Sequence, residues 1–165
     1  MYVLGIDPGI ANTGWGVVDF VGQKFQPVCY GVIKTQTSDT LEKRIAIIAE
    51  SVKQIVVKYD VKHIAMEDIY FAKNEASAIG VAKVIGAVTY AAYEQGLGIS
   101  MFTPLQIKTA ITGYGRAEKK QVQEMCRLLL KLNAIPRPDH AADALAAAVC
   151  FCNMNATTGR LGVFK

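Results

Sequence analysis

The first part of the chain alternates short apolar runs with glycine-containing turns. An apolar run at residues 2–6 is followed by Asp7 and then by Pro8-Gly9, a pair that forces the chain to turn. Residues 13–21 and 24–35 are rich in β-branched and aromatic side chains and are separated by another glycine turn. This pattern predicts three strands in an antiparallel meander, with Asp7 at the end of the first strand.

After the predicted meander, the apolar residues follow the period of an α-helix. Apolar residues recur at spacings of three and four through residues 41–59, which predicts an amphipathic helix. Residues 38–40 offer side chains that can cap the start of this helix. Glu42 stands three residues after Asp39, which is the spacing of a capping box.

A second carboxylate follows the next predicted strand. The short apolar run at residues 61–66 ends at Glu67. A helix that connects two buried strands usually makes a crossover, so we expect the strands at 2–6 and 61–66 to be parallel neighbours. Asp7 and Glu67 would then lie side by side at one edge of a sheet.

The second half of the chain is mainly helical in pattern. Residues 75–94 predict a helix rich in small residues, which allow close packing on the sheet or against a helix of a second copy, and the sequence leaves both open. The elements predicted after it are a strand at 99–103, a short helix opened by Pro104, a basic helix at 117–132 and a last helix that starts at Asp139-His140.

Length and composition limit the class of protein. The 165 residues are 52% hydrophobic and 19% charged, which is typical of a globular domain. We expect one domain over residues 1–153 and a short, flexible tail at 154–165. No apolar run approaches the roughly 20 residues of a membrane span, and no signal-peptide pattern opens the chain. The four cysteines lack metal-binding spacing, so we expect a reduced, cytoplasmic protein.

Positive charge is concentrated in one segment. The formal net charge is +4, and residues 108–137 carry seven basic side chains against two acidic ones. A basic segment beside carboxylates indicates a polyanionic substrate that the carboxylates approach through metal ions. For any single lysine, a solvated helix face is the alternative interpretation.

Acidic residues and a histidine gather at the start of the last predicted helix. His140 lies three residues and Asp139 four residues before Asp143, so either can share a helix face with it. An aspartate in an alanine-rich helix either pairs locally or binds a ligand. Together with Asp7 and Glu67, these oxygen ligands suit Mg²⁺ or Mn²⁺, and an imidazole shifts the preference toward Mn²⁺. Two such ions about 4 Å apart can hold a scissile phosphate.

Five motifs follow one another in order over essentially the whole chain. They are Gly5-Ile6-Asp7-Pro8-Gly9, Thr13-Gly14-Trp15-Gly16, Glu67 with Tyr70-Phe71-Ala72-Lys73-Asn74, Ala117-Glu118-Lys119 and His140-Ala141-Ala142-Asp143-Ala144-Leu145. With this ordered set the chain resembles the bacterial crossover-junction endonucleases of the RuvC family, in the RNase H-like superfamily. The resemblance implies an α/β fold, with a mixed five-stranded sheet of order 3-2-1-4-5 flanked by helices. It also implies a homodimer that resolves Holliday junctions by paired, symmetric, Mg²⁺-dependent nicks.

The resemblance also assigns roles to residues of this chain. Asp7, Glu67, His140 and Asp143 match the four metal-binding catalytic positions, which implies two Mg²⁺ ions per subunit with Mn²⁺ as a substitute. Many members have aspartate where this chain has His140, and others have histidine, which leaves the metal preference open. Asp139 precedes the motif and ranks lower as a ligand, because it could serve as the helix N-cap.

Four further residues are candidates for binding DNA. Tyr70 matches an aromatic residue that stacks on unpaired bases near the junction centre, and Lys73 belongs to the same motif. Lys108 and Lys119 match basic positions near the active site, where they would contact phosphate. The alternatives are a packing role for Tyr70, with Phe71 as the more natural core residue, and plain surface charge for the lysines.

The resemblance favours a Holliday junction resolvase in recombination and repair, with the RuvA–RuvB branch-migration machinery as partner. A related nuclease on other branched DNA or RNA is the first alternative. A nucleotide-binding domain of the sugar-kinase or actin type fits poorly. This chain is too short for that class, and such a site does not need the carboxylate on the last helix. A junction-binding protein without catalysis is disfavoured, because clustered acids repel DNA unless metals bridge them.

Overall fold

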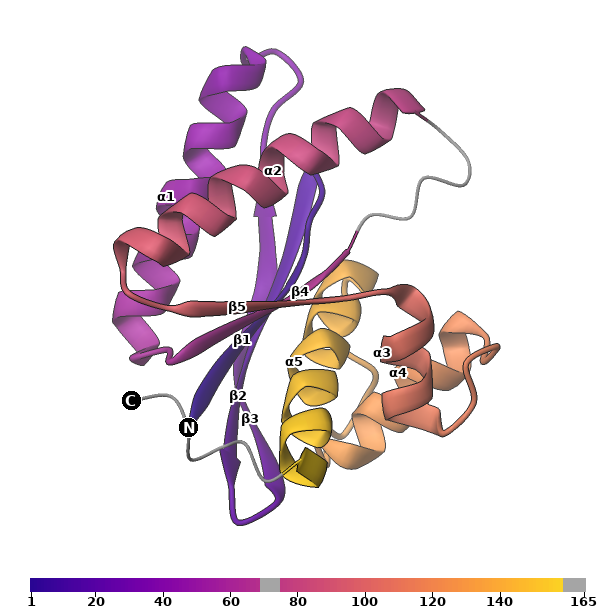
Figure 1. The fold of residues 1–165 in the computed structure, drawn as a ribbon. Helices are drawn as coiled ribbons and strands as arrows, with labels where there is room; N and C mark the ends of the chain where they lie inside the picture. Colours follow the sequence, from indigo (N-terminus) through magenta and orange to yellow (C-terminus); the bar gives the residue numbers. More distant parts are fainter. Residues whose placement is uncertain (69–74, 159–165) are drawn as a thin grey trace.

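A mixed five-stranded sheet runs through the molecule, with helices on both faces (Figure 1). The computed structural model describes residues 1–68 and 75–158. The strands, in the sheet order β3-β2-β1-β4-β5, are Lys24–Lys34, Asn12–Val21, Tyr2–Asp7, His63–Glu67 and Gly98–Phe102. The helices are α1 (Leu41–Tyr59), α2 (Glu75–Glu94), α3 (Pro104–Thr112), α4 (Lys119–Leu129) and α5 (Asp139–Thr158). The predicted fold class and strand order are confirmed.

The strand pairing brings two carboxylate-bearing strand ends together. β1, β2 and β3 form the predicted antiparallel meander. β1 and β4 are parallel neighbours, with Ile6 opposite Met66, so the next residue of each strand, Asp7 and Glu67, stands at the same edge. The crossover through α1 produces this pairing, as the helix between two buried strands predicted.

One face of the sheet is covered by α1 and α2 (Figure 1). Ile48 and Val52 of α1 and Val84 and Val88 of α2 are buried in a shared core with β1 and β4. The start of α1 differs from the predicted capping box on Asp39. Thr40 is the N-cap instead, and its side chain accepts a hydrogen bond from the Lys43 N–H at 3.4 Å.

The opposite face carries α5, with α3 and α4 packed beside it (Figure 1). α5 is buried along most of its length, and its small side chains let it lie against β1 and β2. Cys126, Cys150 and Cys152 are buried in this core, as expected for reduced cysteines in an apolar setting.

Glycines in β1 and β2 allow α5 to approach the sheet unusually closely. A Cβ atom at Gly5 would lie 1.8 Å from the Ala144 carbonyl oxygen, and one at Gly14 would lie 2.0 Å from the His140 carbonyl oxygen. Only residues without a side chain fit at these contacts. The first turns of α5 are therefore held directly over the ends of β1 and β2.

Three helix boundaries, in α4 and α5, differ from the sequence pattern. α4 begins at Lys119, not at residue 117, because Glu118 is its N-cap and the Glu118 N–H donates to the Gln121 side chain at 2.8 Å. It ends at Leu129, before residue 132, since Lys131 has a left-handed φ of 52°. α5 continues to Thr158, past the domain end expected at residue 153. Among the described residues, no helix is long and apolar enough to cross a membrane.

Candidate active site

Four predicted ligands come from three elements that meet at one edge of the sheet. Asp7 is the last residue of β1 and Glu67 the last residue of β4. His140 and Asp143 lie in the first turns of α5, which crosses β1 and β2. The turn after Asp7 is tied to β2, because the buried Thr13 hydroxyl donates to the Gly9 carbonyl at 2.7 Å. The backbone therefore holds this group of side chains in place.

The carboxylates of the site lie close enough together to change one another's pKa values. Burial and, to a smaller extent, the negative charges of Asp7 and Asp143 raise the pKa of Glu67 to about 7, while nearby lysines oppose the shift. Burial also raises the pKa of Asp7, and its hydrogen bond to His140 offsets part of this. Raised pKa values in a group of acids are typical of functional sites, because folding alone gives no benefit from such crowding.

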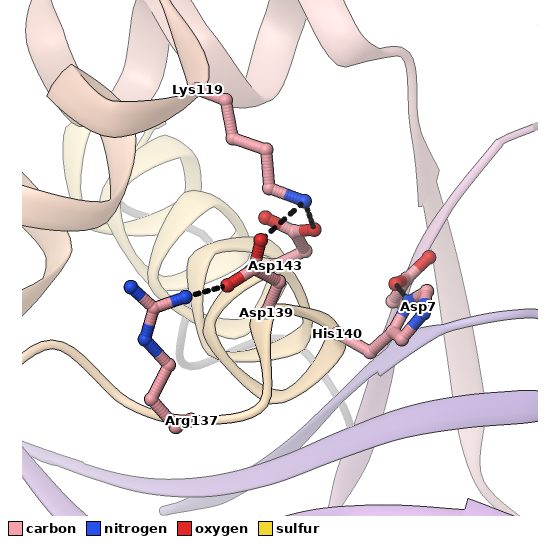
Figure 2. A network of polar contacts seen from close by, with 6 residues as sticks. All are labelled: Asp7, Lys119, Arg137, Asp139, His140 and Asp143. Carbon is pink, nitrogen blue, oxygen red and sulfur yellow. Dashed lines mark hydrogen bonds and ion pairs between the residues drawn. The ribbon is translucent and has the colours of Figure 1, made fainter.

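Asp7 and His140 form one of two polar pairs in the site (Figure 2). His140 Nδ1 lies 2.7 Å from Asp7 Oδ2, and the Asp7 side chain is mostly buried while the imidazole is about half exposed. A carboxylate that bonds one ring nitrogen fixes the orientation of the ring. This pair joins the end of β1 to the start of α5.

Lys119 makes the second pair, on the other side of the α5 start (Figure 2). Its Nζ lies 2.8 Å from Asp143 Oδ2 and 3.6 Å from Asp139 Oδ2. Asp139 also forms an ion pair with Arg137. The carboxylate of Asp139 is therefore engaged by two cations. Because Asp139 is already the first residue of α5, it is not the N-cap that the sequence suggested.

Lys108 and Lys119 both face the carboxylates. A pocket of about 250 Å³ is lined by Glu67, Lys108, Lys119 and Asp143, with the apolar side chains Pro104, Ile107, Val122 and Ala146 as its remaining wall. The two lysines also act on Glu67 through their charge, lowering its pKa against the effect of burial. Of the residues singled out in the sequence, Glu67, Asp143, Lys108 and Lys119 thus share one cavity.

The donor set fits a hard divalent cation. Asp7, Glu67 and Asp143 supply carboxylate oxygens, and His140 supplies an imidazole nitrogen. Within residues 1–68 and 75–158, however, no three acidic, histidine or cysteine side chains already form a group that could hold a metal ion. Asp7 is bonded to His140 and Asp143 to Lys119. Metal binding by these residues therefore requires some of their side chains to rearrange.

Tyr70 and Lys73 lie outside the described residues, so their predicted roles remain predictions. Arg137 was missed as a member of the polar network around α5. Its position between Pro136 and Pro138, two residues before Asp139, was the available signal.

The raised pKa of Glu67 predicts a pH-dependent metal affinity. Because a metal ligand must be ionised, affinity for Mn²⁺ should rise with pH by up to about tenfold per unit below pH 7 and level off above it. In the metal-free protein, the contribution of Glu67 to folding stability changes with pH in the opposite direction. The folded-state pKa exceeds the unfolded value, so the stability that Glu67 contributes at low pH is lost as pH rises through about 7.

Thermal unfolding with and without Mn²⁺ between about pH 5.5 and 8.5 checks both statements. The increase in Tm caused by the metal should grow with pH in the wild-type protein. Glu67→Gln is the control, since it removes the titrating group, and its Tm increment should depend much less on pH. A metal increment that is constant with pH in the wild-type protein would contradict the assignment.

Acidic residues at the ends of adjacent central strands and on the helix that crosses them define a nuclease of the RNase H-like class. Residues 3–151 match the family described as crossover junction endodeoxyribonuclease RuvC. The chain belongs to this family.

Individual relatives match this chain over nearly its full length. The crossover junction endodeoxyribonuclease RuvC of Caldanaerobacter subterraneus is 43% identical over 162 residues, covering 98% of both chains. That of Petrotoga mobilis is 45% identical over 153 residues, covering 93% of this chain and 94% of the relative. The Thermus thermophilus RuvC structure has a TM-score of 0.90 at 35% identity, covering 97% of this chain and 98% of that one. The same protein in complex with a Holliday junction substrate has a TM-score of 0.87 at 33% identity, with the same coverage.

These matches bear out the predicted class of enzyme. The protein is an endonuclease that resolves Holliday junctions, a hydrolase of DNA recombination and repair. Nucleases of this family are metal dependent. The alternative substrates and the non-catalytic interpretation are not favoured.

Proposed function

We propose that Asp7, Glu67, His140 and Asp143 bind two Mg²⁺ ions per subunit and are the catalytic residues of junction cleavage, with Mn²⁺ as a substitute. The observation that carries this proposal is the convergence of partly buried carboxylates, one with a pKa raised to about 7, at a single sheet edge. Ions held by these residues would supply an activated water and would stabilise the leaving 3′ oxygen. The products would then carry 5′-phosphates.

The chain's own residues have distinct tasks in this proposal. Asp7 and Glu67 enter the site on adjacent strand ends, so the sheet fixes their separation. His140 is oriented by its bond to Asp7. Lys108 and Lys119 line the same pocket and would contact the phosphates that flank the scissile bond.

We propose that two copies of this chain act together on four-way junction DNA, since paired symmetric cuts need two active sites at a fixed separation. The face of α2 that points away from the core exposes Ile79, Tyr90 and Tyr93, and these apolar and aromatic side chains are our candidates for the dimer contact. Tyr70 and Lys73 would reach unpaired bases and backbone at the junction centre. The RuvA–RuvB complex would be the partner, in the cytoplasm.

A labelled four-way junction tests the activity directly. We would assemble a junction with fixed arms and a short mobile core, label each strand end in turn, and add protein with Mg²⁺ or with Mn²⁺. We expect paired nicks on opposite strands, with ends that DNA ligase seals, and no cleavage of linear duplex. A higher rate with Mn²⁺ would support His140 as a ligand. Tight junction binding without cleavage in either metal would contradict the catalytic assignment.

A further inference from the structure

The ammonium group of Lys119 occupies the space in front of a proposed metal ligand. Lys119 Nζ lies 2.8 Å from Asp143 Oδ2, a charge-assisted hydrogen bond at normal length. The Asp143 side chain is only 24% exposed, so water compensates its charge poorly. Figure 2 shows Lys119 reaching from α4 across to α5, with its ammonium group between Asp143 and Asp139.

The position of Lys119 is set by the fold. Lys119 is the first residue of α4, directly after the N-cap Glu118. The buried Val122 and Cys126 anchor α4 in the same core as α5. A lysine at the start of this helix is thus placed to reach the acidic turn of α5.

The charge of Lys119 acts on the whole acidic group. It lowers the pKa of Asp7, of Glu67 and of Asp139, in each case against an opposing effect of burial. Burial would lower the pKa of Lys119 itself, but its bonds to Asp143 and the nearby carboxylates outweigh this and raise it. The lysine is therefore the cation that these carboxylates share in the structure.

We propose that Lys119 is an internal counter-ion of the metal site, which a divalent cation must displace from Asp143 before that carboxylate can become a ligand. This inference rests on the metal site of the proposed function and adds a competing group to it. The same Asp143 oxygen cannot accept the ammonium hydrogen bond at 2.8 Å and hold a metal ion on the same side. Metal binding and the release of Lys119 are then one exchange.

Asp139 acquires a role in the same exchange. It lies one helical turn before Asp143 on the same face of α5, and Arg137 holds its carboxylate. Its Oδ2 is already 3.6 Å from Lys119 Nζ, so a small rotation would let the displaced ammonium group bind Asp139. Asp139 therefore retains the lysine beside the site and is not one of the metal ligands.

Metal affinity in the absence of DNA tests this competition. Lys119→Met removes the charge and keeps most of the length of the unbranched side chain. We expect the variant to bind Mn²⁺ about tenfold more tightly than the wild-type protein, measured by calorimetric titration and by the electron paramagnetic resonance signal of free Mn²⁺. The matched control is Lys120→Met, because Lys120 is the next residue, is exposed and lines a different groove with Tyr114 and Gln121. Its Mn²⁺ affinity should stay within about twofold of wild type.

Thermal unfolding supplies a second readout. Without metal, Lys119→Met should have a lower Tm than wild type, because the carboxylates lose their shared cation. At saturating Mn²⁺ the difference should vanish or reverse, as linkage requires. Equal Mn²⁺ affinities, with equal Tm values in both conditions, would overturn this proposal while leaving the metal site intact. Absence of Mn²⁺ binding by both proteins would contradict the metal site and this proposal together.

Discussion

Replacement of Asp7 by asparagine is expected to slow junction cleavage by at least about a thousandfold, with junction binding changed by no more than about threefold. Asparagine has nearly the same shape as aspartate and keeps an oxygen that can bond His140, so the end of β1 should retain its structure. What it loses is the negative charge at the buried centre of the acidic group. A ligand of the reacting metal ions contributes several kcal/mol to transition-state stabilisation, which corresponds to this loss in rate.

Single-turnover cleavage at saturating protein measures the chemical step, and fluorescence anisotropy in Ca²⁺ measures junction binding separately. Asp19→Asn is a closely matched control. Asp19 lies on β2 in the same sheet, its side chain is 21% exposed against 19% for Asp7, and its partner is the N-terminal amino group. Its cleavage rate should remain within about threefold of wild type. An Asp7→Asn variant that cleaves within about tenfold of wild type would show that Asp7 is not an essential ligand.

The sequence predicted the elements that have a clear hydrophobic period. The strands of the meander, rich in β-branched and aromatic side chains, and the three-and-four spacing of α1 occur where they were expected. The crossover rule placed Asp7 beside Glu67 because it depends only on the order strand, helix, strand. The full strand order came from the resemblance to a known family, since local pattern does not determine which edge β5 occupies.

The contacts between side chains of different elements were not predictable in this way. The family resemblance placed Lys119 near the active site, with a solvated helix face as the alternative, but its bond to Asp143, 24 residues later in the chain, could not be derived from the local pattern. The helix limits also depend on local bonds that hydropathy does not report. The cap at Glu118 shortens α4, and the Asn153 side chain donates to the Ala110 carbonyl at 3.0 Å, within the longer α5.

Gly14 controls how closely α5 approaches the catalytic strand ends, although it carries no functional group. It stands opposite Asp7 in the β1–β2 ladder, and a Cβ atom there would lie 2.0 Å from the His140 carbonyl oxygen and 2.9 Å from the His140 Cβ. In Gly14→Ala the first turn of α5 must therefore move away by on the order of 1 Å, because packed interiors have no room to absorb the overlap. The shift would separate His140 and Asp143 from Asp7 and Glu67.

We expect Gly14→Ala to lower cleavage about a hundredfold and to destabilise the protein by about 2–3 kcal/mol, or about 5–10 °C in Tm. Single-turnover cleavage and thermal unfolding measure the two effects, and Mn²⁺ titration should show weaker binding. Gly31→Ala is the matched control in the same sheet, because the three atoms nearest to its added Cβ all belong to the Trp15 ring, at 3.2 Å, and none belongs to the backbone of α5. It should cost less than about 1 kcal/mol and leave cleavage unchanged. Normal cleavage by Gly14→Ala would mean that the site tolerates a retracted α5, and that the close approach serves packing alone.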